Sequence, residues 1–317
     1  MRVLITGASG FVGPHLVDSL QRMGIGTLFL TSKHAVMHPG LGRVEALDVT
    51  DANATDEMIA SCTPDCVVHL AGIAAPAVAS ADPQMAWRVH LQGTLNLAYS
   101  ILNQDPRCSL LFVGSGMVYG TSASSRQRLD EQTLLAPIDE YAVTKAAADL
   151  ALGALARQGL KCIRLRPFNH TGPGQDEAFM VPGFAMQIAR IEAGRQPPVI
   201  HVGNLDAVRD ILDVRDVADA YALAGKKAAE IAAGTVLNVC SGTGHRVRAI
   251  LDQLLALSST QIAVEQDPTR VRPSDLPHVV GDGGRARALL GWKPSRSLEN
   301  TLADVLADCR QRVANCE

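Results

Sequence analysis

Residues 7–13 read Gly7-Ala8-Ser9-Gly10-Phe11-Val12-Gly13; they follow the apolar run Val3-Leu4-Ile5 and precede a helical pattern. In such a turn Gly7 allows the tight bend, Gly10 lets a pyrophosphate approach the backbone, and Gly13 lets the helix lie close to the sheet. The helix N-terminus then offers free N–H groups and a partial positive charge to phosphates. The strand before and the helix after provide the context that a dinucleotide site requires, with an ordinary glycine-rich turn as the alternative.

Outward from this turn, the first half of the chain alternates strand and helix patterns. Helices are expected at 11–23, 83–104, 140–158 and 214–230, and strands at 2–6, 26–31, 43–47, 65–71, 108–114, 161–166 and 235–239. Continuous apolar strands that alternate with helices indicate a parallel sheet covered on both faces. The expected fold class is therefore α/β, with a doubly wound (Rossmann) sheet that binds ligands beyond the carboxyl ends of its strands.

After Pro167 the pattern changes, because residues 168–183 carry turn formers and no long periodicity. Helices near 182–194, 246–258 and 298–313 and short strands near 199–202 and 261–265 follow. This predicts a smaller, discontinuous C-terminal α/β substrate domain. The predicted boundaries are residues 1–167 plus about 211–239 for the dinucleotide-binding domain, and 168–210 with 240–317 for the nucleotide-sugar domain.

Composition excludes several classes of partner. The net charge is −3 with both signs mixed and only 4% of residues are aromatic, which argues against nucleic-acid binding. No signal peptide or long apolar run is present, so we expect a cytoplasmic protein without a membrane partner. Seven scattered cysteines predict no disulfide framework, and Cys62 and Cys66 lack a second pair at zinc spacing, so no metal is expected.

The end of the second predicted strand reads Thr31-Ser32-Lys33-His34 and contains no acid. An acid there would bind the adenosine ribose and repel a 2′-phosphate, so hydroxyls and a lysine favour NADPH. Lys33 could equally be a solvated charge, which leaves NADH possible. Asp48 is placed to accept from the adenine amino group. The predicted cofactor-binding residues are Gly7, Ser9, Gly10, Phe11, Val12, Gly13, Ser32, Lys33, Asp48, Val49, Leu70, Ala71, Gly72, Tyr141, Lys145 and Pro167.

Three further residues predict proton chemistry. Tyr141 and Lys145 are four residues apart in a predicted helix and share one face. A nearby ammonium would favour the phenolate, and the tyrosine could then exchange a proton with a carbonyl oxygen while Lys145 holds the ribose and tunes it. Ser115 follows the strand 108–114, where its hydroxyl could bond the same oxygen. A surface tyrosine above an exposed lysine is the alternative.

These motifs resemble the extended short-chain dehydrogenase/reductase family over essentially the whole chain. Ser115, Tyr141 and Lys145 match its catalytic residues. Further matches are Val118-Tyr119-Gly120, 202–210 (VGNLDAVRD), 238–242 (NVCSG), 270–275 (RVRPSD) and 166–175 (RPFNHTGPGQ), whose ending is similar to the branch of GDP-4-keto-6-deoxymannose reductases. The resemblance implies NAD(P)H-dependent reduction of the C4 keto group of GDP-4-dehydro-6-deoxy-D-mannose, giving GDP-6-deoxy-D-mannose (GDP-D-rhamnose) or its C4 epimer.

The resemblance also implies the substrate-binding residues. Ser115 would contact the sugar, Arg209 and Arg272 the diphosphate, Asn169 the diphosphate or sugar, Asp275 a ribose hydroxyl, and main-chain groups near Val181 the guanine. His90 stands where the family usually has asparagine. Family members also commonly form homodimers through a four-helix bundle, here the helices at 83–104 and 140–158. Their apolar residues Leu95, Leu97, Leu150 and Leu152 fit this role but could equally face the sheet.

Two residues separate the possible reactions. The family's dehydratases resemble one another in carrying acids directly after the catalytic serine or threonine, whereas this chain has Gly116 and Met117, which cannot exchange a proton. The sequence therefore favours reduction of a ketone over elimination of water. A nucleotide-sugar 4-epimerase or 4,6-dehydratase remains the alternative enzyme. A non-catalytic dinucleotide-sensing protein is the alternative of another class, although such proteins tend to lose the tyrosine or lysine.

Overall fold

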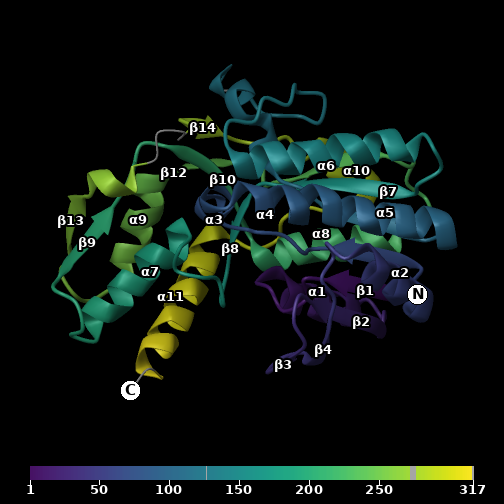
Figure 1. Cartoon of the computed structure of the whole chain (residues 1–317). Coiled ribbons are helices and arrows are strands. Elements are labelled where there is room, and N and C mark those ends of the chain that lie inside the picture. Colours follow the sequence, from purple (N-terminus) through teal and green to yellow (C-terminus); the bar gives the residue numbers. More distant parts are fainter. Residues whose placement is uncertain (126, 272–275, 316–317) are drawn as a thin grey trace.

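The computed structural model describes residues 1–125, 127–271 and 276–315, and its centre is an eight-stranded sheet (Figure 1). The strand order is β11-β7-β6-β5-β1-β2-β4-β3, and every pair is parallel except β3 with β4. The strands are β1 (Arg2–Thr6), β2 (Thr27–Ser32), β3 (Val36–His38), β4 (Gly42–Ala46), β5 (Cys66–His69), β6 (Ser109–Val113), β7 (Cys162–Pro167) and β11 (Thr235–Val239). The expected doubly wound α/β class is confirmed.

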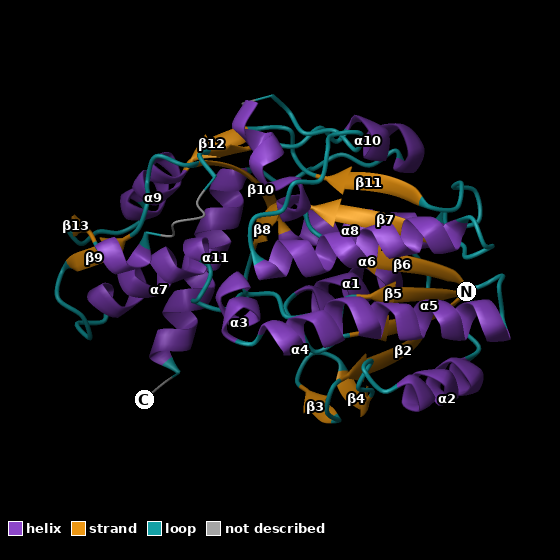
Figure 2. Cartoon of the chain, turned by 45° about the horizontal axis from the view of Figure 1, so that its top comes forward, coloured by secondary structure: helices purple, strands orange, loops and turns teal. Residues whose placement is uncertain are grey.

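Helices cover both faces of this sheet (Figure 2). Alternate residues of β1 point to opposite faces, so Val3 and Ile5 pack with α1 (Val12–Arg22), α8 (Val214–Lys226) and α10 (Gly284–Leu290), while Leu4 packs on the other side. That other face carries α2 (Ala52–Cys62), α5 (Gly93–Gln104) and α6 (Glu140–Ala156). Strand order reverses between β1 and β5, which is where a doubly wound sheet binds its ligand.

A second core lies beside the sheet, at the left of Figure 1. It is built from α7 (Met180–Glu192), α9 (Val247–Ala256) and α11 (Leu298–Ala314), with the two-stranded sheet β9 (Val199–Val202) and β13 (Ala263–Gln266). Between the two cores runs a smaller sheet. Its strands are β8 (Asn169–Thr171), β10 (Val208–Asp213), β12 (Gly244–Arg246) and β14 (His278–Val279).

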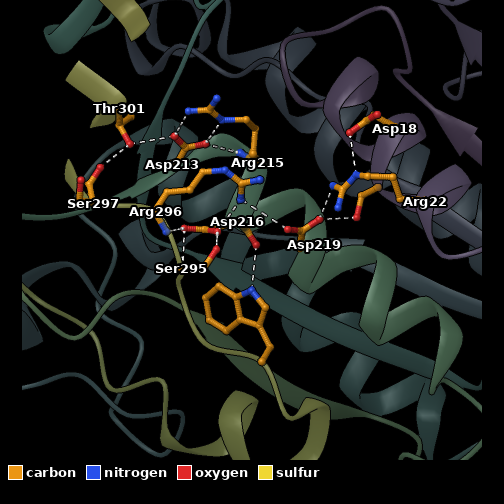
Figure 3. A network of polar contacts seen from close by, with 12 residues as sticks. Asp18, Arg22, Asp213, Arg215, Asp216, Asp219, Ser295, Arg296, Ser297 and Thr301 are labelled. Atoms are coloured by element: carbon orange, nitrogen blue, oxygen red, sulfur yellow. Dashed lines mark hydrogen bonds and ion pairs between the residues drawn. The ribbon is translucent and has the colours of Figure 1, made fainter. Parts of the chain in front are cut away.

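A polar network joins the C-terminal segment to the α1–α8 face (Figure 3). The buried carboxylate of Asp216 accepts hydrogen bonds from Arg296 Nη1 (2.7 Å) and Ser295 Oγ (2.9 Å). Arg22 of α1 reaches Asp219 at 2.8 Å, so three segments distant in sequence meet here. Because a buried charge is costly unless it is paired, this network fixes how the last helix docks.

The helix expected at 83–104 has these bounds and consists of α4 (Pro83–Trp87), a π-helical segment (Arg88–Gln92) and α5 in direct succession. Two of the leucines for which a dimer interface and the sheet were both possible, Leu97 and Leu152, are buried in the sheet-facing core, whereas Leu150 is 60% exposed. Several elements had no clear sequence pattern, including α2, α3 (Pro76–Ala81), β3, β10 and α10.

Among the described residues, no helix is long and apolar enough to cross a membrane. Six cysteines fall within this part of the chain, and each is a buried free thiol. Burial raises the pKa of the Cys108 thiol to about 12, so it remains a protonated packing group.

Candidate active site

A cleft with a volume of about 1100 Å³ opens at the carboxyl ends of the central strands and extends to the second core. All predicted cofactor-binding residues except Gly13 line it, as do Ser115, Asn169 and Arg209. Val181 does not line the cleft, because its side chain packs in the second core, although its neighbours Phe179 and Met180 do. Arg272 and Asp275 lie outside the described residues.

The glycine turn is shaped by close backbone approaches. Gly7 has a φ of +71°, and a Cβ at this position would lie 2.7 Å from the backbone nitrogen of Ala71 after β5. A Cβ on Gly13 would lie 1.9 Å from the carbonyl oxygen of Ala8, so only glycine lets α1 pack this close. The turn and the N-terminus of α1 therefore form an open backbone cradle suited to a pyrophosphate, which fits a dinucleotide.

The end of the cleft formed after β2 and β4 combines hydroxyl, cationic and acidic groups. Ser32 Oγ donates to the carbonyl of His34 (2.6 Å), and Lys33 lines the cleft beside it. Asp48 accepts from the hydroxyl of Thr50 (2.7 Å). This hydrogen bond, with smaller contributions from Lys33 and Arg88, lowers the pKa of the Asp48 carboxyl. Arg88 also lines the cleft and was missed, because no motif marks it.

The predicted catalytic residues converge at the opposite end. Asp139 begins α6 by accepting from the backbone nitrogen of Ala142 (2.8 Å), which places Tyr141 and Lys145 one turn apart. The Ser115 hydroxyl lies near enough to the Tyr141 phenol to lower its pKa, and Lys145 Nζ donates to the carbonyl of Val113 (3.0 Å). A loop after β6 and a helix beside it thus bring three side chains to one point.

Burial dominates the electrostatics at this point. It raises the pKa of the Tyr141 phenol, and the Ser115 hydroxyl opposes this only in part. The Lys145 ammonium is directed at the Val113 carbonyl and lies 5.5 Å from the centre of the Phe112 ring. Burial lowers the pKa of Lys145 to about 8. Burial thus favours the protonated phenol, and the expectation that the ammonium favours the phenolate stays a prediction.

His90, in the π-helical segment, ties α6 to the loop after β5. Its Nε2 accepts from the backbone nitrogen of Ile73 (2.9 Å), so Nδ1 carries the proton and faces Thr144 Oγ1 (2.8 Å). The ring also meets Tyr141 edge to face, with centroids 5.6 Å apart. Burial, aided by the charge of Lys145, lowers the pKa of His90 to about 3. A neutral imidazole here positions α6 against the loop after β5.

A second buried histidine supports the same region. His69 Nδ1 faces Thr6 Oγ1 at 2.7 Å, and His69 Nε2 faces Thr94 Oγ1 at 3.1 Å. Thr94 in turn donates to the carbonyl of His90 (2.6 Å). These hydrogen bonds link β1 and β5 to the π-helical segment, and burial lowers the pKa of His69 to about 3.

The segment after β7 brings substrate-side residues to the glycine turn. The ring of Phe11 stacks on His170, with centroids 6.1 Å apart and planes 3° from parallel. Arg209 Nη1 donates to the carbonyl of Leu276 (2.7 Å) and its side chain lines the cleft. Acids also line the described cleft, but none follows Ser115; they are Asp48, Asp139 and Glu177.

An α/β sheet with this cradle and this tyrosine–lysine pair at one cleft defines the class of NAD(P)-dependent oxidoreductases. Comparison with known proteins narrows the class: the chain belongs to the NAD dependent epimerase/dehydratase family, whose model matches residues 3–240. The resemblance to extended short-chain dehydrogenases/reductases is thereby confirmed.

Two sequence relatives and one solved structure are similar to this chain over nearly their whole length. A GDP-6-deoxy-D-mannose reductase from Pseudomonas aeruginosa is 33% identical over 313 residues, 98% of each chain. A GDP-6-deoxy-D-talose 4-dehydrogenase from Aggregatibacter actinomycetemcomitans is 28% identical over 297 residues, 92% of each chain. The structure of RMD from Pseudomonas aeruginosa complexed with NADPH has a TM-score of 0.84 at 30% identity, covering 98% of this chain and 100% of the other.

Proposed function

We propose that this protein uses NADPH to reduce the C4 keto group of GDP-4-dehydro-6-deoxy-D-mannose, giving GDP-6-deoxy-D-mannose or its C4 epimer. The observation that carries the proposal is the meeting of Ser115, Tyr141 and Lys145 at one end of the cleft, with no acid after the serine. Relatives that act on GDP-6-deoxyhexoses supply the substrate class. Such a site can exchange a proton with a carbonyl but has no group next to Ser115 for eliminating water.

The three side chains have separate tasks in this reaction. When bound, the reduced nicotinamide supplies a hydride. Tyr141, still protonated because of its burial, donates its proton to the carbonyl oxygen, and the hydroxyl of Ser115 hydrogen-bonds the same oxygen. Lys145, whose pKa is about 8, stays largely protonated at neutral pH and stabilises the resulting phenolate.

The remaining site residues are assigned to the two ligands. The glycine turn would hold the pyrophosphate of the dinucleotide, Asp48 its adenine, and Ser32 with Lys33 a 2′-phosphate. Residues 168–210 and 240–317 would hold the nucleotide sugar, with Asn169 and Arg209 in the described cleft. The family resemblance also assigns Arg272, Asp275 and the main chain near Val181 to the substrate; Arg272 and Asp275 lie outside the described residues.

The experiment supplies the purified protein with GDP-mannose, a GDP-mannose 4,6-dehydratase and NADPH. Loss of reduced-nicotinamide absorbance that requires the dehydratase is expected, and NMR of the product sugar then assigns the configuration at C4. Turnover of GDP-mannose by this protein alone would instead reveal a dehydratase and overturn the proposal.

A 4-epimerase is the second candidate, because the matched family includes epimerases and the same three side chains serve that chemistry. An epimerase returns its hydride to the sugar and consumes no cofactor. Interconversion of a nucleotide sugar and its C4 epimer without added NADPH would favour this candidate. Net oxidation of one NADPH for each sugar favours the reductase.

We also propose a homodimer that pairs α5 and α6 of two copies. Tyr99 on α5 and Leu150 on α6 are 49% and 60% exposed, and Trp87 on α4 is partly exposed nearby in the sequence. Apolar side chains of this size on neighbouring helices are typical of interfaces. The proposed compartment is the cytoplasm, where buried free thiols stay reduced.

A further inference from the structure

A continuous apolar segment follows β5 and lines the cleft. Its six residues carry no hydrogen-bonding side chain; they are Ile73, Ala74, Ala75, Pro76, Ala77 and Val78, and all of them line the cleft. Val78, in α3, is 56% exposed, so part of this apolar surface is open to a ligand. Open apolar surface inside a cleft is typical of a binding site. Residues 73–78 are called the apolar wall below.

The apolar wall begins at the catalytic end of the cleft. Gly72 precedes it, and a Cβ on Gly72 would lie 3.1 Å from Lys145 Nζ. The backbone nitrogen of Ile73 donates to His90 Nε2 (2.9 Å), and the ring of His90 meets that of Tyr141 with centroids 5.6 Å apart. Further along the chain, α3 packs against α6, the helix that carries Tyr141 and Lys145. The wall therefore lies beside the groups that would act on the ketone.

The main chain of the wall also offers little to a polar ligand. The backbone nitrogen of Ile73 is already engaged by His90, and Pro76 has no N–H group. The backbone nitrogen of Val78 donates to the carbonyl of Ala75 (3.0 Å). A hydroxyl held against this surface would lose hydrogen bonds to water and find few replacements, which is unfavourable.

We propose that the apolar wall receives the C6 methyl group of the sugar and so selects 6-deoxyhexoses over hexoses with a hydroxyl at C6. The inference rests on the proposed function. In the ketosugar, C4 is flanked on one side by C3 with its hydroxyl and on the other by C5 with the methyl group. When Ser115 and Tyr141 hold the C4 oxygen, the methyl is the flank that loses no hydrogen bond at the wall.

The wall would also act against the precursor of the ketosugar. A dehydratase makes the ketosugar from GDP-mannose, which still has a hydroxyl at C6. GDP-mannose fits the nucleotide part of the cleft equally well, so discrimination has to come from the surface around C6. Contact with the wall would keep GDP-mannose from occupying the reductase.

The experiment compares GDP-6-deoxy-D-mannose with GDP-D-mannose, which differ only by the hydroxyl at C6. Calorimetric titrations in the presence of NADP⁺ measure both affinities, with GDP as the reference ligand that lacks a sugar. Val78→Thr is the test variant, because it keeps the shape of valine and adds a hydroxyl that can hydrogen-bond the one at C6. Val36→Thr is the matched control, since Val36 is a 42% exposed valine of β3 that does not line the cleft.

The unaltered protein is expected to bind GDP-6-deoxy-D-mannose about ten- to hundredfold more tightly than GDP-D-mannose. Val78→Thr should reduce this ratio about three- to tenfold, the effect of one neutral hydrogen bond, and leave GDP affinity unchanged. Val36→Thr should keep the ratio of the unaltered protein.

Two results would overturn the assignment of the wall. Equal affinity of the unaltered protein for the two GDP-sugars, with NADPH-dependent reduction of the ketosugar intact, would refute it and leave the proposed function standing. An undiminished ratio in Val78→Thr would place the methyl group elsewhere in the cleft. Failure of the unaltered protein to reduce the ketosugar would instead refute the proposed function, and the assignment would fall with it.

Discussion

Single residues decide the chemistry, and Tyr141 is the most important of them. Replacing Tyr141 by phenylalanine removes the proton donor but keeps the ring that packs against His90. We expect turnover to fall by about 10²- to 10⁴-fold, the usual contribution of a positioned general acid, with NADPH affinity nearly unchanged. Steady-state kinetics and a fluorescence titration of NADPH measure both. Wild-type turnover in Tyr141→Phe would refute the assignment of the proton donor.

His69 and His90 predict how stability depends on pH. Burial lowers both pKa values to about 3, whereas an unfolded histidine titrates near 6.5. As the pH falls below about 6.5, the unfolded chain takes up protons that the folded protein does not. The free energy of unfolding therefore falls, by up to about 1.4 kcal/mol per pH unit for each histidine.

Urea unfolding between about pH 7 and pH 5 measures this slope. Burial also lowers the pKa values of His15 and His170, so they add to the same slope. His90→Asn removes one of these titrations while retaining a side chain that can hydrogen-bond Ile73 or Thr144. Its free energy of unfolding should depend on pH less steeply than that of the wild type. Identical slopes would mean that His90 is protonated in the folded protein, contrary to its hydrogen bonds.

The contact between α1 and the glycine turn leaves no room for a side chain at residue 13. In Gly13→Ala the new Cβ would lie 1.9 Å from the carbonyl oxygen of Ala8, so the helix must move away from the turn. We expect a loss of about 1–3 kcal/mol in unfolding free energy and a clear loss of NADPH affinity. Gly26→Ala is the control, because no atom lies within 4 Å of its added Cβ. Equal stability and NADPH affinity in the two variants would contradict the described packing.

The elements also show what could be read from the chain. The glycine turn, Ser115 and the helix with Tyr141 and Lys145 were predictable, because turn residues, apolar runs and helical spacing are local properties. The π-helical segment at Arg88–Gln92 was not, because no local residue pattern in the chain marks a widened helical turn. Strand β10 (Val208–Asp213) mixes three charged with three apolar residues and pairs with β8, β12 and β14, so its burial depends on the tertiary fold.

Individual site residues also differ in whether the local sequence or the tertiary fold determines their place. Arg88 lines the cleft from the π-helical segment without any motif to mark it, and Tyr221 looks like one more apolar position of an amphipathic helix. The phenol of Tyr141 was correctly placed, but its pKa depends on burial and on where the ammonium of Lys145 points. Neither property can be obtained from spacing alone.

At the scale of the whole molecule, the proposed dimer can be tested through its apolar face. Leu150→Asp places a charge on the exposed side of α6 and should yield monomers, because a buried unpaired charge is costly at an interface. Leu289→Asp on α10 is the control, since Leu289 is also exposed but lies on the other face of the sheet. Light scattering reports the mass of each; a dimeric Leu150→Asp variant would refute this interface.

The proposed reaction requires that hydride passes to C4 of a GDP-linked ketosugar in the cleft beside Tyr141. NADPH carrying deuterium at the transferable position of its nicotinamide tests it, with GDP-4-dehydro-6-deoxy-D-mannose as substrate and NMR of the product. We expect one deuterium at C4 of the 6-deoxyhexose and loss of the label from the cofactor. Label that stays on the cofactor while the sugar is converted, or label at another carbon, would contradict it.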